Sequence, residues 1–260
     1  MFNVDDLVLH ERRNDVVTLW LNRPQQFNAL SEEMLSALKE QLDLIASDSS
    51  IRCVVLAAKG NAFCAGHDLR EMQQNQNTVF YQNLFRLCSD VMLRIQSLPV
   101  PVVARVQGVA TAAGCQLVAS CDLAVAAIEA RFGVSGINLG LFCATPSVAL
   151  TRNVSAKRAF EMLFTGRFID AKTAVEWGLV NESVERDDLD IAVDVLTSAI
   201  SSKSATAVRY GKSMIYRQQL MPVEDAYAYA SEVMACNAME SDAIEGIGAF
   251  LDKRPAKIKR

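Results

Sequence analysis

Two segments rich in small residues hold the groups of this chain best suited to chemistry. The first is Ala62–Leu69, with the sequence AFCAGHDL, and the second is Gln107–Gln116, with the sequence QGVATAAGCQ. In each, an apolar run leads into small residues, so the backbone can approach a ligand closely and point N–H groups at it. Two such segments together could form one oxyanion hole, a pair of donors that stabilises negative charge developing on an oxygen.

Length and composition set the class of protein that must position these segments. The chain has 260 residues, of which 51% are hydrophobic and 22% charged, which is typical of a compact soluble α/β or α-rich protein with a large core. The net charge is −4, and no long basic stripe carries interleaved aromatic residues. These features argue against nucleic acid as the main partner.

Cysteine usage and the N-terminal residues indicate the compartment. The seven cysteines include no C-x-x-C pair, and an odd number argues against a full disulfide framework. The N-terminal residues lack a basic stretch followed by an apolar one, so no secretory signal is expected. The long uncharged stretch 132–151 is interrupted by glycines and a proline, which argues against a membrane span. The sequence predicts a cytoplasmic protein with no membrane partner.

Periodicity predicts alternating strands and helices over the first two thirds of the chain. Hydrophobic runs predict strands at 16–21, 53–57, 102–106 and 123–126. Helical spacing predicts a helix that begins near Ser31 and another over 78–97. This alternation favours parallel sheets layered against helices. After about 154 the pattern is almost entirely helical, and we expect a core over 1–200 followed by a helical segment over 201–260.

Four motifs in order resemble the crotonase, or enoyl-CoA hydratase/isomerase, superfamily. They are Leu21-Asn22-Arg23-Pro24, the 62–69 segment, Gly114-Cys115-Gln116-Leu117 and Phe250-Leu251-Asp252-Lys253-Arg254. The resemblance covers nearly the whole chain. It implies an α/β fold of the crotonase (ClpP/crotonase) type, a spiral of stacked ββα turns with a C-terminal α-helical trimerisation region. It also implies a homotrimer or a homohexamer built as a dimer of trimers.

The resemblance further implies an acyl-CoA site whose oxyanion donors are the backbone N–H groups of His67 and Ala113. Ala113 is expected to open a short helix that continues to Ser120, which would turn the positive end of its dipole toward the oxygen. No metal is expected, and no cofactor beyond the coenzyme A of the thioester substrate. The positions matched to coenzyme A contacts are Gln25, Gln26, Phe27, Ala29, Ala65, Gly66, His67, Asp68, Leu69, Arg70, Gly114 and Lys253.

Two departures from the family pattern bear on the reaction. Hydratases of the family carry one glutamate directly after the Gly-Cys pair and a second about twenty residues later, and here these positions are Gln116 and Gly136. An amide is no general base near neutral pH, and glycine has no side chain. Cys143 lies near the place where another branch has an aspartate. It could be a nucleophile if its pKa were lowered, but a buried, inert thiol is favoured.

Three functions follow from these residues. The favoured one is an enzyme of acyl-CoA metabolism that stabilises an enolate or a tetrahedral oxyanion without the two-glutamate water, as a lyase, isomerase or hydrolase. The second is an acyl-CoA-binding or scaffold protein that has lost its catalytic groups. The third is a true enoyl-CoA hydratase with a base from another position.

Overall fold

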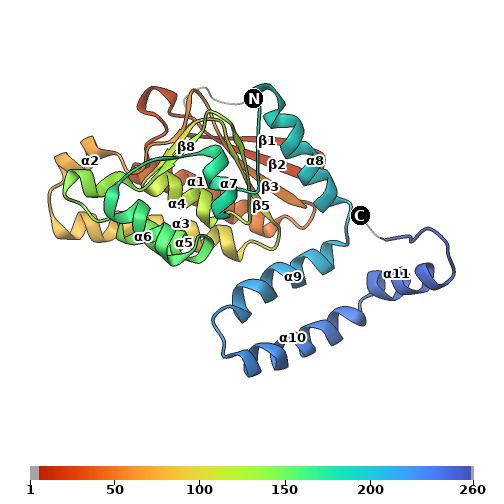
Figure 1. Ribbon diagram of the computed structural model, residues 1–260. Helices are drawn as coiled ribbons and strands as arrows, with labels where there is room; N and C mark the ends of the chain where they lie inside the picture. Colours follow the sequence, from red (N-terminus) through yellow and green to blue (C-terminus); the bar gives the residue numbers. More distant parts are fainter. Residues whose placement is uncertain (1–5, 259–260) are drawn as a thin grey trace.

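The computed structural model describes residues 6–258, and two sheets form the centre of the molecule (Figure 1). Within these residues the larger sheet has the order β1(Val8–Arg13), β2(Val16–Leu21), β3(Cys53–Ala58), β5(Val102–Val106), β7(Leu123–Ala127) and β10(Glu182–Val184). The smaller sheet has the order β4(Ala62–Cys64), β6(Val109–Thr111), β8(Arg131–Gly133) and β9(Ile169–Asp170). Pairing is parallel except for β1 with β2 and β8 with β9.

The chain winds between the two sheets in a repeating order. Strands β3, β5 and β7 each join the larger sheet, and the strand that follows each of them, β4, β6 or β8, joins the smaller one. Helical segments follow each pair and return the chain to the next turn. This is a spiral of ββα turns, as the sequence predicted.

The helices form at segments with clear start signals and apolar faces. In α1(Glu32–Ser47) the Ser31 hydroxyl accepts a hydrogen bond from the Met34 amide, and two glutamates complement the positive end of the helix. Five side chains of α1 on one face are buried, the same five that helical spacing indicates: Met34, Leu35, Leu38, Leu42 and Ile45. The other helices are α2(Leu69–Gln74), α3(Thr78–Ser97), α4(Ala113–Ser120), α5(Ala144–Asn153), α6(Ala156–Thr165), α7(Ala171–Trp177), α8(Leu189–Ser201), α9(Ala205–Gln218), α10(Val223–Ala238) and α11(Ser241–Leu251), with 3-10 turns η1(Pro24–Gln26), η2(Ser135–Leu139) and η3(Arg186–Asp188).

The larger sheet is covered on both faces. One face packs with α1, α3 and α4 into the main core, which extends to the smaller sheet. The other face of β3, β5 and β7 packs against α8 through a second cluster of buried residues: Cys53, Val55, Ala57, Val103, Val125, Ala127, Leu189 and Val193. Strand β3 is therefore buried on both faces, which explains why it reads as an unbroken apolar run.

Helices α9, α10 and α11 project from the rest of the molecule (Figure 1). A buried polar cluster fastens α9 to the core. The Lys212 ammonium donates to the carbonyls of Ile95 and Val100 and to the Asp122 carboxylate, and the Tyr216 hydroxyl donates to the same carboxylate. Beyond this anchor, α10 and α11 expose large apolar side chains, among them Tyr227, Met234 and Phe250. The predicted boundary near residue 200 falls at the end of α8.

The predicted strands and helices of the first two thirds are present with bounds that agree within a residue or two. The three short strands of the smaller sheet in the spiral, β4, β6 and β8, were not predicted, because a run of three residues is too short to show a period. Among the described residues, no helix is both long and apolar enough to cross a membrane.

Candidate functional site

The two small-residue segments lie side by side. Strand β4 of the first pairs in parallel with β6 of the second, with Ala62 opposite Val109 and Cys64 opposite Ala110. Just beyond the strands, a β-carbon built on Gly66 would lie 2.9 Å from the Ala112 β-carbon and 3.3 Å from the Ala113 nitrogen. The backbone of the first segment therefore passes within van der Waals contact of the start of α4.

Gly114 permits the closest of these approaches. A β-carbon at this position would lie 2.1 Å from the Cys64 carbonyl oxygen and 2.8 Å from the Cys64 β-carbon. These distances are far inside van der Waals contact, so no side chain fits. The small residues that make the second segment conspicuous are therefore required for its contact with the first.

Helix α4 begins on a strained residue. Ala112, its N-cap, has φ 50° and ψ −119°, a conformation that residues with a β-carbon rarely adopt. Ala112 is held there because its amide donates to the Gly133 carbonyl and its carbonyl accepts from the Gln116 amide. Ala113 is the first residue of α4, as predicted, so its N–H has no acceptor within the helix and lies at the positive end of the helix dipole.

The backbone around His67 is held by an isolated parallel bridge to Leu30. The Leu30 amide donates to the Gly66 carbonyl, and the Asp68 amide donates to the Leu30 carbonyl. In such a bridge the groups on either side of the central residue face the partner, so the His67 N–H faces the other way. The bridge thus fixes the direction of this amide without using it.

The His67 imidazole lies in an apolar setting. Its ring meets that of Phe85 edge-on, with centroids 5.3 Å apart, and neither ring nitrogen has a hydrogen-bond partner among the described residues. Burial lowers the pKa of His67 to about 4. The ring is therefore uncharged at neutral pH, and the role of the His67 amide stays a prediction.

The lowered pKa of His67 makes the folded state sensitive to acid. The unfolded chain binds a proton at this residue near its ordinary value of 6.5, whereas the folded chain does so only near about 4. Between these values the free energy of unfolding should fall as pH falls, by up to about 1.4 kcal/mol per pH unit from this residue. We expect urea unfolding of the His67→Asn variant to lose this slope. Parallel pH profiles for the two proteins would contradict the assignment.

Two acidic residues, Asp68 in the first segment and Glu71 just after it, accept hydrogen bonds from backbone amides. Asp68 caps α2 by accepting from the Arg70 and Glu71 amides, and it pairs with Arg23 at 3.1 Å. Partial burial acts to raise the pKa of Asp68, but the hydrogen bond from the Glu71 amide and the contact with Arg23 outweigh it, so the pKa is lowered. The Glu71 carboxylate accepts from the Glu32 amide at the start of α1. Both carboxylates thus hold helix termini.

Gln116 lies on the first turns of α4 with only 5% of its surface exposed. Its Oε1 atom is buried and has no hydrogen-bond partner among the described residues. A buried acceptor of this kind is normally satisfied by protein or by ordered water, so its isolation is unusual. The side chain can accept or donate a hydrogen bond to a bound molecule, but it cannot remove a proton from one.

The Cys143 side chain lies where a side chain at position 136 would be. A β-carbon on Gly136 would lie 2.6 Å from the Leu141 carbonyl oxygen and 2.7 Å from the Cys143 sulfur. The thiol therefore fills the position that a longer side chain at 136 would need. Burial raises the pKa of Cys143, so the sulfur is a protonated thiol at neutral pH and a poor nucleophile.

The remaining predicted positions divide into two groups. Gln25, Gln26 and Phe27 are exposed around η1, and the Phe27 carbonyl accepts from the Ala65 amide, so η1 borders the first segment. Leu69 and Arg70 are exposed at the start of α2 beside it, and Ala29 is buried behind η1. Lys253, however, follows α11 at the opposite end of the molecule from α2 (Figure 1). Within one chain the structure does not bring Lys253 to this site.

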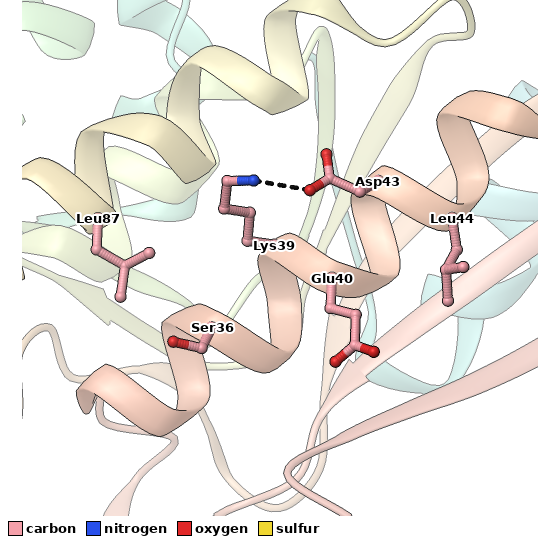
Figure 2. Close-up of a pocket in the computed structure, with 6 residues that line it drawn as sticks. All are labelled: Ser36, Lys39, Glu40, Asp43, Leu44 and Leu87. Carbon is pink, nitrogen blue, oxygen red and sulfur yellow. Dashed lines mark hydrogen bonds and ion pairs between the residues drawn. The ribbon is translucent and has the colours of Figure 1, made fainter.

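Two hollows of the surface lie away from the paired segments. Figure 2 shows the first, about 390 Å³ along α1, where Lys39 and Asp43 form an ion pair at 2.7 Å and α3 contributes Leu87 to the lining. The second, about 340 Å³, lies between α8 and strands β1 and β2. Neither contains a residue of the two segments. Within residues 6–258, no three His, Cys, Asp or Glu side chains are grouped as metal ligands.

Two buried amide side chains near the site were not identified from the sequence. Asn28 and Gln107 both donate to the Ala62 carbonyl at 2.9 Å, at the end of the turn before β4. Asn28 follows the Arg-Pro motif by four residues, and Gln107 opens the second segment. Only the folded chain shows that both act on one turn.

The spiral of two sheets and the paired amide segments define a protein of the crotonase superfamily. The sequence profile described as enoyl-CoA hydratase/isomerase matches residues 11–260. This chain belongs to the enoyl-CoA hydratase/isomerase family.

Curated and solved relatives agree with this assignment. Enoyl-CoA hydratase domain-containing protein 3, mitochondrial, of Xenopus laevis is 42% identical over 248 residues, which cover 95% of this chain and 84% of that protein. The crystal structure of the human protein of the same name has a TM-score of 0.93 at 39% identity and covers 96% of this chain and 99% of that chain. The 140–146 stretch, GLFCATP, indicates a resemblance to enoyl-CoA hydratase domain-containing protein 3 in particular, and these matches confirm that resemblance. A crystal structure of an enoyl-CoA hydratase from Mycobacterium smegmatis has a TM-score of 0.95 at 57% identity and covers 96% of this chain and 98% of that chain.

Proposed function

We propose that this chain is an enzyme that acts on acyl-CoA thioesters by stabilising negative charge on the thioester oxygen. The observation that carries the proposal is the juxtaposition of two backbone N–H groups whose directions are fixed independently, that of His67 by its bridge to Leu30 and that of Ala113 by the start of α4. A thioester oxygen between them would gain two hydrogen bonds as it becomes an enolate or a tetrahedral oxyanion.

The side chains at the site favour reactions that need no carboxylate base. Gln116 and Gly136 stand where the family's hydratases carry glutamates, and Asp68 and Glu71 are committed to helix termini. In the decarboxylation of a malonyl-type thioester, the breaking C–C bond supplies the electron pair of the enolate and carbon dioxide leaves. Such a reaction requires an oxyanion hole but no protein base. Thioester hydrolysis, isomerisation and C–C bond formation each require a further group.

Turnover tests this proposal. We expect the protein to consume at least one thioester in a panel of enoyl-, malonyl-type and hydroxyacyl-CoA esters, and to hydrate crotonyl-CoA poorly. The Cys143→Ala variant should retain activity because a protonated thiol contributes no nucleophile. Tight binding of CoA esters without consumption of any would overturn the proposal that the protein is an enzyme. The second function, an acyl-CoA-binding or scaffold protein, would then remain, and the absence of both glutamates favours it.

A hydratase with a non-standard base is the third function. The similarity to a short-chain-enoyl-CoA hydratase from Clostridium acetobutylicum, 32% identical over 252 residues, supports this third function. Rapid hydration of crotonyl-CoA that the Gln116→Glu change leaves unaffected would establish it and contradict the role we give to position 116.

Restoring the second glutamate should fail for a steric reason. In a Gln116→Glu, Gly136→Glu variant, the new side chain at 136 meets the Leu141 carbonyl, and a backbone atom cannot move aside cheaply. We expect even Gly136→Ala to lower the free energy of unfolding by about 1–3 kcal/mol. Gly211→Ala, in α9 with open space around its α-carbon, is the matched control. Equal urea midpoints for the two alanine variants would contradict this.

The finer assignments on assembly, compartment and cofactor belong to the same proposal. We expect a trimer or hexamer in which α10 and α11 bury their exposed apolar side chains, so that Lys253 would reach the site of a neighbouring copy. Sedimentation of the purified protein tests this.

A cytoplasmic location is consistent with seven free cysteines. The curated relatives named enoyl-CoA hydratase domain-containing protein 3 carry the word mitochondrial in their names, so fractionation of the source cells decides between the two. Coenzyme A, as part of the substrate, remains the one cofactor that we expect.

A further inference from the structure

The side-chain amide of Gln107 joins the two donor segments. Gln107 lies at the start of the second segment, between β5 and β6, and is 3% exposed. Its Nε2 atom donates to the carbonyls of Ala58 at 3.0 Å, Gly60 at 3.2 Å and Ala62 at 2.9 Å. These carbonyls lie at the end of β3, in the turn that follows and at the start of β4, where the first segment begins.

The contacts themselves determine how the Gln107 amide is oriented. If it were reversed, Oε1 would face three carbonyl oxygens, which repel it. In the orientation present, Oε1 is buried and has no partner among the described residues. Leaving a buried acceptor unsatisfied is unfavourable. A simple apolar side chain would fill this space without that penalty, so the contacts of Nε2 account for an amide here.

A second buried amide holds the same turn. Asn28, fully buried, donates through Nδ2 to the Lys59 and Ala62 carbonyls, each at 2.9 Å. The backbone after Gln107 also touches the turn, because a β-carbon on Gly108 would lie 1.9 Å from the Asn61 carbonyl oxygen. The position of β4, and of the His67 amide beyond it, therefore depends on contacts that begin at Gln107.

We infer that Gln107 is a positioning residue that sets the spacing between the N–H groups of His67 and Ala113. This role rests on the proposed function, because it matters only if both amides bind one oxygen. We call the three hydrogen bonds from the Gln107 amide to the Ala58, Gly60 and Ala62 carbonyls the clamp. The exposed residues of η1 and α2 predicted to contact coenzyme A do not bond to Gln107. Loss of the clamp should therefore lower kcat while KM changes little. A displacement of about 1 Å between the donors should cost about 10²-fold in rate.

Two variants remove the clamp in different ways. Gln107→Met keeps the length of the side chain and removes its donors, and Gln107→Glu directs a carboxylate oxygen at the three carbonyls. The matched control is Asn181→Leu, which removes a side-chain acceptor of the Ala124 amide on β7, a hydrogen bond that involves neither donor segment. The probe is an acyl-CoA labelled with ¹³C at the thioester carbonyl, whose stretching band moves to lower frequency when the oxygen accepts hydrogen bonds. Affinity for the same ligand and circular dichroism are measured in parallel.

The outcomes separate this inference from the function on which it rests. We expect Gln107→Met and Gln107→Glu to bind the ligand within about 3-fold of wild type with a band close to that of the free thioester, while Asn181→Leu keeps the shifted band. A shifted band in a folded Gln107 variant would overturn the inference and leave the proposed function intact. If wild type binds no acyl-CoA, the proposed function fails. If one variant does not fold, the other decides the question.

Discussion

Replacing the peptide bond between Ala112 and Ala113 by an ester should lower kcat on the preferred thioester by about 10²–10³, which is the usual cost of removing one oxyanion donor. The ester, introduced with the hydroxy-acid analogue of alanine at 113, exchanges only the N–H for an oxygen and leaves every side chain in place. Because Ala113 opens α4, its N–H supports no hydrogen bond within the helix. Steady-state kinetics measure the loss, and KM should change little.

A second ester separates catalysis from stability. Ala156 is the first residue of α6, in the same position that Ala113 has in α4, and it lies in neither donor segment. An ester between Ser155 and Ala156 should leave kcat within about 2-fold of wild type. If both esters lower kcat equally, the Ala113 amide is not an oxyanion donor.

The Gly114→Ala variant should lose about 10²-fold in activity and about 1–3 kcal/mol of the free energy of unfolding. The new β-carbon would lie 2.1 Å from the Cys64 carbonyl oxygen, so the start of α4 and the first segment must separate by roughly 1 Å. Helix propensity acts in the opposite direction, because alanine is favoured over glycine inside a helix by up to about 1 kcal/mol. A net loss of stability therefore measures the steric contact.

Gly211→Ala in α9, outside the two helices expected to pack in the oligomer, is again the control, because nothing lies within contact distance of a β-carbon there. It should raise the urea midpoint slightly and leave activity unchanged. A Gly114→Ala variant with wild-type activity would show that the distance between the two segments is not critical.

Prediction from the sequence succeeded where a residue's role follows from its own type and spacing. The apolar face of α1 and the cap at Ser31 depend on local patterns, whereas the start of α4 at Ala113 was expected from the family resemblance. The family motifs added the pairing of the two segments, which no local pattern contains. Gln116 and Gly136 were conspicuous because they depart from those motifs.

What the sequence could not show depends on contacts between distant segments. The strained backbone of Ala112 exists because Gly133 and Gln116 hold it, and no property of an alanine predicts that. The hydrogen bonds of Asn28 and Gln107 to the Ala62 carbonyl join residues 79 positions apart. Similarly, only the folded chain shows that the Cys143 sulfur fills the space beside Gly136, which makes the missing glutamate difficult to restore.

The most direct test of the proposed oxyanion hole is the carbonyl stretching frequency of a ¹³C-labelled acyl-CoA bound to the wild-type protein and to the Ala112–Ala113 ester. Two N–H donors should move the band below that of the free thioester in wild type, and loss of one should return it part of the way. A bound thioester whose carbonyl absorbs at the free frequency in wild type would contradict the oxyanion hole on which this account of the protein depends.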